Sequence, residues 1–303
     1  MSDSDEAFWS LGYERGYIEM KELENSSDQK RRLILCMQDK GGCGRSTCAS
    51  LIVDWLRQRG GMRLAVFDAD VCRSTLTEIY GANGSAPLRA PDLFASVDWS
   101  DPQMGLCNID VVVRCLGVDQ PPTAEVAVLD ASANSTSLLL RWLRDTKVFS
   151  IAEHFGIVVT VAIPVDGTAR AAQDAADLLC ALDRRADVLI MRNAKGVKHI
   201  PWDECFRDGR HAHANWQEIE IPAFGEQLGS FLEMQAYRGG RLSLLGATQC
   251  PDREARIHAP ECWAAVERSF AGVTRILVPD LSIIPRQASG KLSSTVVEVE
   301  SKA

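Results

Sequence analysis

Short apolar runs recur along this chain and alternate with segments of helical periodicity. The runs lie at 31–38, 62–68, 109–115, 126–130, 157–163 and 188–191, and several have no polar interruption. Such runs predict strands that are buried on both faces, as in a parallel sheet. Helical spacing of apolar residues follows at 49–57, 136–147 and 168–182. We therefore predict an α/β fold, a doubly wound and mostly parallel sheet flanked by helices.

The same pattern divides the chain into three parts. We expect one doubly wound α/β domain over about 31–280, an acidic, aromatic N-terminal arm over 1–30, and a mobile tail over 281–303 that is rich in Ser, Gly, Lys and Val. The segment 201–260 has glycine-rich spots that indicate loops around one or two helices. A chain of 303 residues is long enough to bury a large hydrophobic core, so it does not need disulfides or metal ions to fold.

Composition narrows the class of protein. With 46% hydrophobic and 24% charged residues, the chain resembles an ordinary globular protein rather than a fibrous or disordered one. Its apolar runs are too short to cross a bilayer, so no stable membrane insertion is expected. The acidic start lacks the pattern of a secretory signal, and the ten cysteines include no Cys-x-x-Cys pair. We expect a cytoplasmic protein with reduced thiols and without a disulfide framework.

The negative charge is unevenly distributed. The net charge is −8, of which −5 belongs to residues 1–30, so the predicted domain is nearly neutral. The total charge therefore does not indicate DNA binding, although basic clusters at 141–147 and 184–185 could contact DNA phosphate. The alternative for both clusters is an ordinary solvated helix face.

A glycine-rich loop connects the first predicted strand to the first predicted helix. Glycine lets successive backbone N–H groups surround a phosphate, and the N-terminus of the following helix attracts its negative charge. The general phosphate-loop motif begins with a glycine, where this chain has Asp39. We expect nucleotide phosphates to be bound by the whole loop: Gly41, Gly42, Cys43, Gly44, Arg45, Ser46 and Thr47.

The segment Lys40-Gly-Gly-Cys-Gly-Arg-Ser46 resembles the deviant Walker A motif, KGGxGK[ST], of the ParA/MinD superfamily of P-loop ATPases. This superfamily includes plasmid-partition, division-site and TraL-like conjugal-transfer proteins. The resemblance implies ATP and Mg²⁺ as cofactors and an ATP-dependent homodimer acting in partition, positioning or conjugal transfer. It also implies that Lys40 reaches the phosphates held by the partner subunit.

The motif departs from the family at Arg45, where the family has its P-loop lysine. Arginine keeps the charge, but its planar fork is not interchangeable with an ammonium at a tight site. Two interpretations stay open. One is a weak ATPase forming ADP and phosphate, with Lys40, Arg45 and Asp70 as catalytic residues. The other is a nucleotide-binding adaptor that does not hydrolyse ATP.

Two further strand ends resemble signatures of the same family. Val66-Phe-Asp-Ala-Asp70 resembles its hhhDxD motif, which implies that Asp68 lies near Mg²⁺ and that Asp70 orients the attacking water. The strand that ends at Asp130 resembles Walker B. The resemblance thus implies a metal site formed by Ser46, Asp68 and Asp130. Asn193 resembles the asparagine that reads adenine, although a turn asparagine is an equal alternative.

Other residues suggest chemistry of lower specificity. A thiol at a helix N-terminus can have a lowered pKa, so Cys43 and Cys48 are either redox-sensitive or small packing residues. A third alternative for the whole protein is a redox or metallochaperone relative, but Cys250 and Cys262 lack the spacing of a cluster site. His211 and His213 could hold a metal or belong to a solvated loop. Aromatic residues at four-residue spacing in the arm could bind a protein partner or dock on the domain itself: Trp9, Tyr13 and Tyr17.

Overall fold

The computed structural model describes residues 30–70, 72–98, 105–118, 120–182, 184–193, 206 and 215–279, with side chains in the helix at 105–114 described from residue 110. The predicted aromatic arm, the predicted tail and the histidines at 211 and 213 lie outside the described residues.

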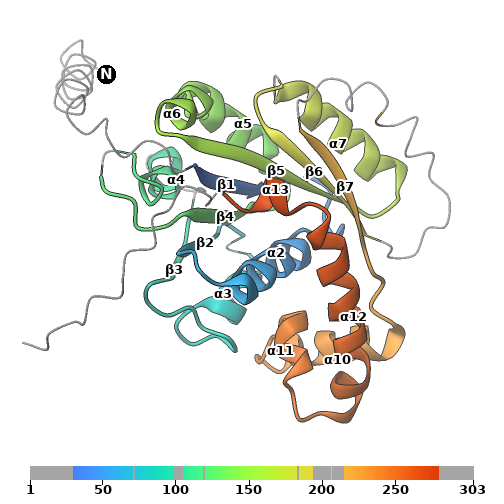
Figure 1. Ribbon diagram of the computed structural model, residues 1–303. Coiled ribbons are helices and arrows are strands. Elements are labelled where there is room, and N and C mark those ends of the chain that lie inside the picture. The colour runs from blue at the N-terminus through green and yellow to red at the C-terminus, as the bar shows by residue number, and fades with distance from the viewer. Residues whose placement is uncertain are drawn as a thin grey trace, which may run out of the picture.

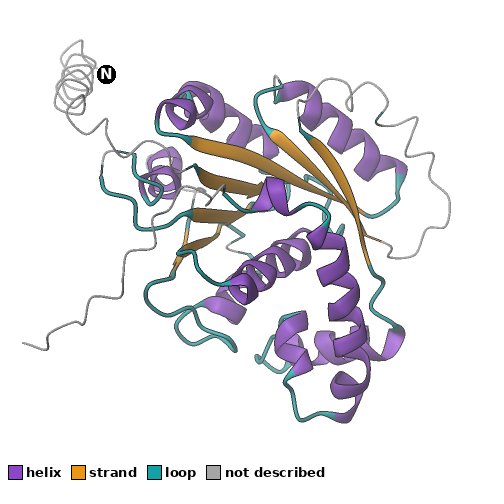
Figure 2. Cartoon of the chain, viewed as in Figure 1, coloured by secondary structure: helices purple, strands orange, loops and turns teal. Residues whose placement is uncertain are grey.

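Seven strands form a single parallel sheet, shown in Figures 1 and 2. They are β1 (Arg31–Cys36), β2 (Leu64–Asp68), β3 (Leu93–Ser96), β4 (Val126–Asp130), β5 (Ile157–Val165), β6 (Asp187–Asn193) and β7 (Trp216–Ile221). Their order is β3-β2-β4-β1-β5-β6-β7, and every adjacent pair is parallel. The predicted fold class is therefore confirmed.

Helices cover both faces of this sheet (Figure 1). One face carries α4 (Gly105–Arg114), α5 (Thr136–Asp145), α6 (Val148–His154) and α7 (Ala169–Ala181). The other carries α2 (Arg45–Arg59), α3 (Thr75–Tyr80), α10 (Glu226–Tyr237), α11 (Leu244–Thr248), α12 (Arg253–Ala271) and α13 (Thr274–Leu277). Buried residues divide into two clusters, one on each side of the sheet.

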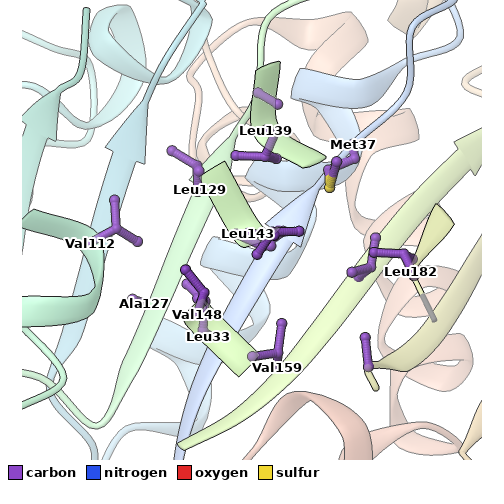
Figure 3. Packing of buried hydrophobic residues seen from close by; sticks show 14 of the residues in the cluster. Leu33, Met37, Val112, Ala127, Leu129, Leu139, Leu143, Val148, Val159 and Leu182 are labelled. Atoms are coloured by element: carbon purple, nitrogen blue, oxygen red, sulfur yellow. The ribbon is translucent and has the colours of Figure 1, made fainter. Parts of the chain in front are cut away.

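Alternation along the strands explains the two clusters. In β1, Leu33 and Leu35 belong to the cluster under α4–α7, whereas Ile34 and Cys36 belong to the cluster under α2. All four side chains are fully buried, so the strand reads as one continuous apolar run. Figure 3 shows the first cluster, with Leu143 of α5 lying over the strands. Burial on both faces is thus the physical cause of the pattern that predicted the sheet.

One predicted strand is wrong. The run 109–115 lies almost wholly in helix α4, and its burial follows helical spacing, because Val112 and Val113 are buried while Val111 is 42% exposed. Consecutive valines favour strands, but a short apolar run cannot by itself distinguish a strand from a buried helix. Packing against the sheet decides in favour of the helix here.

The C-terminal third contains more helix than predicted. Instead of one or two helices among loops, α10, α11 and the long α12 pack over the second face of the sheet. Helix α12 continues through Pro260, the last residue of the segment in which loops were predicted, and is capped at its start by the side chain of Asp252. Strand β3 was also missed, since three of its residues are only partly buried and Ser96 is exposed. Within the described parts of the chain, no helix combines the length and the apolar character needed to span a membrane.

Candidate functional site

The candidate site lies at the carboxyl edge of the sheet, around the end of β1. The chain runs from β1 to β2 on one side and from β4 across to β5 on the other, so the strand order reverses around β1. Crevices at such reversals are where open α/β sheets bind ligands. Cys36 at the end of β1 lies in register with Asp130, and Asp130 lies in register with Asp68. The loops that follow these strands therefore meet at one place.

The glycine-rich loop has the backbone needed to bind a phosphate. Gly42 and Gly44 adopt φ values of +82° and +89°, which L-residues rarely adopt. A Cβ at Gly42 would meet no atom within 4 Å, so the loop is open above this residue. Among the described groups, no acceptor is found for the backbone N–H of Gly42, Gly44, Ser46 or Thr47. Free N–H groups at the start of the 15-residue helix α2 form an anion-binding surface.

Arg45 lies at the centre of the site and is bonded to protein groups on three sides. Its Nη2 donates to Asp70 Oδ2 at 2.9 Å, its Nε to Asp130 Oδ1 at 3.2 Å and its Nη1 to the Gln38 carbonyl at 3.0 Å. The residue is 7% exposed, so its charge is balanced inside the protein rather than by water. Arg45 thus joins the loop to the two strand ends that the sequence singled out.

Burial strongly affects the carboxyl group of Asp130. Desolvation raises its pKa to about 7, although Arg45 and a hydrogen bond from Ser46 act in the opposite direction. Its Oδ2 is buried and has no partner that meets hydrogen-bond geometry among the described residues. Asp130 and Ser46 are therefore neighbours, as the resemblance to Walker B implies.

Asp68 has a structural task in this arrangement. Its Oδ2 accepts hydrogen bonds from the backbone N–H and the hydroxyl of Thr77, both at 2.8 Å, and its Oδ1 accepts from the Asp70 N–H at 3.0 Å. Burial raises its pKa, and these hydrogen bonds act against that shift. The carboxylate anchors α3 and the turn before it, in which Ser74 adopts a φ of +46°.

Ser46 and Asp130 are the residues of this chain that could hold a Mg²⁺ ion. Mg²⁺ keeps several waters and is bound through one or two carboxylates together with substrate phosphates, and the unpartnered Asp130 Oδ2 belongs to a side chain that neighbours Ser46. Both oxygens of Asp68 and of Asp70 accept hydrogen bonds, and one oxygen of Asp130 is paired with Arg45. In the described parts of the chain, no group of three or more His, Cys, Asp or Glu side chains is placed to hold a metal ion.

Lys40 pairs with a carboxylate that sequence reasoning missed. Its Nζ donates to Asp166 Oδ2, and Asp166 also accepts from the backbone N–H and hydroxyl of Thr168. Burial opposes ionisation of Asp166, but the bonds from Lys40 and Thr168 prevail and lower its pKa. Asp166 directly follows β5, the neighbour of β1 in the sheet, so its place at a strand end was a usable signal.

Two other polar residues hold the loop in place. The amide of Asn193, at the end of β6, donates to the Cys43 carbonyl at 3.1 Å and lies where a side chain on Gly44 would be. The structure thus brings Asn193 to the loop, while adenine recognition stays a prediction. Asp39, which stands where the general motif has glycine, accepts from the Thr136 N–H at 2.9 Å and ties the loop to the start of α5.

The thiols near the loop are not activated. Burial raises the pKa of Cys43 to about 11 and raises those of Cys36 and Cys48 well above their usual value. Desolvation therefore outweighs the helix N-terminus that favours a thiolate. Of the two interpretations of Cys43 and Cys48, the geometry supports packing residues rather than redox sensors.

Comparisons with known proteins add the following. No protein-family model and no curated protein matches the chain. Similar solved structures include a ParA family ATPase from Chlorobium tepidum TLS, with 13% identity, 78% of this chain and 98% of that chain covered, and a TM-score of 0.49. The septum site-determining protein MinD from Pyrococcus horikoshii OT3, complexed with Mg-ADP, shows 13% identity, coverage of 82% and 99%, and a TM-score of 0.46. The MinC:MinD complex from Aquifex aeolicus shows 15% identity, coverage of 80% and 96%, and a TM-score of 0.43.

The structures that resemble this chain are thus ParA/MinD-type ATPases, the family that its phosphate-loop motif resembles. At these identities and TM-scores, the similarity carries no inference about what the chain binds or does.

Proposed function

We propose that this protein binds ATP at its glycine-rich loop and retains it without appreciable hydrolysis, as a nucleotide-dependent adaptor. Binding is supported by the open glycine backbone and by the free N–H groups at the start of α2. Retention is supported by one observation above all, the pairing of Arg45 with both Asp70 and Asp130.

This pairing bears directly on hydrolysis. Asp70 is the carboxylate that the family resemblance assigns to the attacking water. In this protein its Oδ2 is bonded to Arg45 and its Oδ1 accepts from the Arg73 N–H at 3.2 Å. A carboxylate so engaged is a poor base, because proton transfer requires a free oxygen within reach of the water. Arg45 likewise bonds Asp70, Asp130 and the Gln38 carbonyl, so three of its five N–H groups are not available to a transferred phosphoryl group.

Other parts of the family pattern stay predictions for this chain. They include an ATP-dependent homodimer, the reach of Lys40 to a partner's phosphates, and a task in partition, positioning or conjugal transfer. The pair between Lys40 and Asp166 lies within one chain, so Lys40 would have to leave Asp166 to reach a second subunit.

ATP affinity and steady-state turnover, measured for the wild type, Arg45→Lys and Asp70→Ala, test the proposal. We expect the wild type to bind ATP without measurable turnover, and Arg45→Lys to gain turnover because a compact ammonium lacks the rigid fork that holds Asp70, Asp130 and the Gln38 carbonyl at once. Wild-type turnover that disappears in Asp70→Ala would instead support the ATPase switch. Absence of ATP binding by the folded wild type would contradict both functions.

A further inference from the structure

The side chain of Asn193 reaches the glycine-rich loop from the end of β6, a strand that lies two places from β1 in the sheet. We infer that Asn193 is a positioning residue for the triphosphate chain of the ligand. It orients the Cys43–Gly44 peptide unit of the loop and so supports binding of the triphosphate, whatever base the nucleotide carries. This inference rests on the proposed nucleotide binding and specifies the part of the nucleotide on which Asn193 acts.

One hydrogen bond sets the direction of this peptide unit. Asn193 Nδ2 donates to the Cys43 carbonyl at 3.1 Å. A trans peptide unit is planar, so its C=O and its N–H point in opposite directions. The bond therefore turns the Gly44 N–H away from Asn193. This N–H is one of the loop groups for which no acceptor is found among the described residues.

The peptide unit needs such an anchor because it precedes a glycine. Gly44 has a φ of +89° and a ψ of +24°. Glycine populates positive and negative φ about as readily, so the peptide unit before it can rotate at little cost. Rotation would turn the Gly44 N–H away from the phosphates and present the Cys43 carbonyl oxygen to them. The other side of Gly44 is already fixed, since its carbonyl accepts from the Cys48 N–H at 2.8 Å.

Close packing keeps the amide nitrogen of Asn193 on the loop. A Cβ on Gly44 would collide with Asn193 Nδ2, so the amide occupies the space that another residue would need for its side chain. The acceptor is a carbonyl oxygen, which requires the nitrogen of the amide rather than its oxygen to face the loop. An asparagine that reads adenine uses both its NH₂ and its carbonyl on the base edge. Since the nitrogen of Asn193 is bonded to Cys43, the geometry favours an action on the loop over the reading of a base.

Calorimetric titration of the wild type and Asn193→Ala with Mg-ATP and with Mg-tripolyphosphate, which has no base, tests the inference. We expect the wild type to bind both ligands. Asn193→Ala should bind each of them about threefold to tenfold more weakly, the effect of one lost hydrogen bond, by factors that agree to within about twofold.

Three results would overturn the inference and leave ATP binding by the wild type intact. A larger loss for ATP than for tripolyphosphate would assign Asn193 to the base. Unchanged affinities in Asn193→Ala would exclude Asn193 from binding. A wild type that binds ATP but not tripolyphosphate would show that the loop does not hold phosphates without a base. If the folded wild type binds no ATP, the proposed function fails and this inference fails with it.

Two further variants separate positioning from folding. Asn193→Asp keeps the size of the side chain but replaces the donor by a carboxylate, which repels the Cys43 carbonyl and the phosphates. It should weaken both ligands at least as much as Asn193→Ala, and it decides the matter if the alanine variant does not fold.

Asn215→Ala is the matched control. Asn215 Nδ2 donates to Asp187 Oδ1 at 2.6 Å, and Asp187 begins β6 at the amino edge of the sheet, away from the loop. This variant should be less stable to urea but keep the wild-type affinity for both ligands. Equal weakening in Asn215→Ala and Asn193→Ala would show that lost stability causes the effect, and it would contradict the role given to Asn193.

Discussion

Replacing Arg45 by methionine should destabilise the protein substantially. Methionine fills much of the same volume but leaves the carboxyl groups of Asp70 and Asp130 without their cation, and both side chains are almost fully buried. Removing one partner of a buried ion pair typically costs about 3–5 kcal/mol of unfolding free energy. We expect a loss of that size at neutral pH, measured by urea denaturation followed by both circular dichroism and tryptophan fluorescence.

The size of this loss should depend on pH. In the wild type, burial raises the pKa of Asp130 to about 7, and Arg45 limits the rise. An acidic group whose pKa is raised in the folded state lowers the free energy of unfolding of the protein as pH rises, until the pH passes the folded pKa. In Arg45→Met the folded pKa of Asp130 is higher still, so the variant continues to lose stability above pH 7 where the wild type has stopped. The gap between the two proteins should therefore widen from pH 6 to pH 9.

Arg63→Met provides the control for this experiment. Arg63 also binds a carboxylate, with Nη2 at 2.6 Å from Glu125 Oε1, but its side chain is 40% exposed. An exposed pair contributes only about 0–1 kcal/mol. A loss below about 1 kcal/mol in Arg45→Met, or a loss that does not change with pH, would refute the reasoning that Arg45 balances two buried carboxylates.

Two further predictions concern neighbouring groups. Because the bond to Lys40 lowers the pKa of Asp166 in the folded protein, this pair should stabilise the protein above the unfolded pKa and lose its effect in acid. Asp166→Asn should therefore reduce the fall in the free energy of unfolding as the pH is lowered through the acid range. The same fall in the wild type and in Asp166→Asn would contradict this. Iodoacetamide at pH 8 should alkylate the exposed Cys72 and Cys180 and spare Cys43, because burial raises the pKa of Cys43 to about 11. Mass spectrometry identifies the labelled cysteines. Early labelling of Cys43 would contradict its inert character.

Sequence reasoning predicted the sheet well because the strands are buried on both faces. Continuous apolar runs at 126–130 and 157–163 correspond to β4 and β5, and the glycine-rich loop falls between β1 and α2 as expected. The valine-rich run at 109–115 was wrongly predicted as a strand, because packing against the sheet overrides its local β-propensity and favours helix α4. The extent of α12 was also missed, since Pro260 in the helix argues against a continuous helix on local grounds.

The candidate site was predictable in its members but not in its pairing. Strand-end aspartates and the loop were found from motif and position, and the sheet brings Arg45, Asp70 and Asp130 together. The pairing depends on contacts that are distant in sequence, because Asp70 lies 25 positions and Asp130 lies 85 positions from Arg45. No local sequence pattern encodes which carboxylate oxygen each N–H group of Arg45 bonds. Asp166, 126 positions from Lys40, was missed for the same reason.

The central claim, that ATP binds at the glycine-rich loop, is tested most directly by the ATP affinities of the wild type, Gly42→Val and Gly60→Val. Both glycines have positive φ values, +82° and +61°, and a Cβ at either would meet no atom within 4 Å. Valine should strain the backbone at both positions, by about 1–3 kcal/mol each, but only Gly42 lies in the loop, whereas Gly60, with a ψ of −172°, caps the far end of α2. The account predicts that the wild type and Gly60→Val bind ATP alike and that Gly42→Val binds at least about tenfold more weakly. Equal affinity in all three folded proteins, or no binding by the wild type, would contradict it.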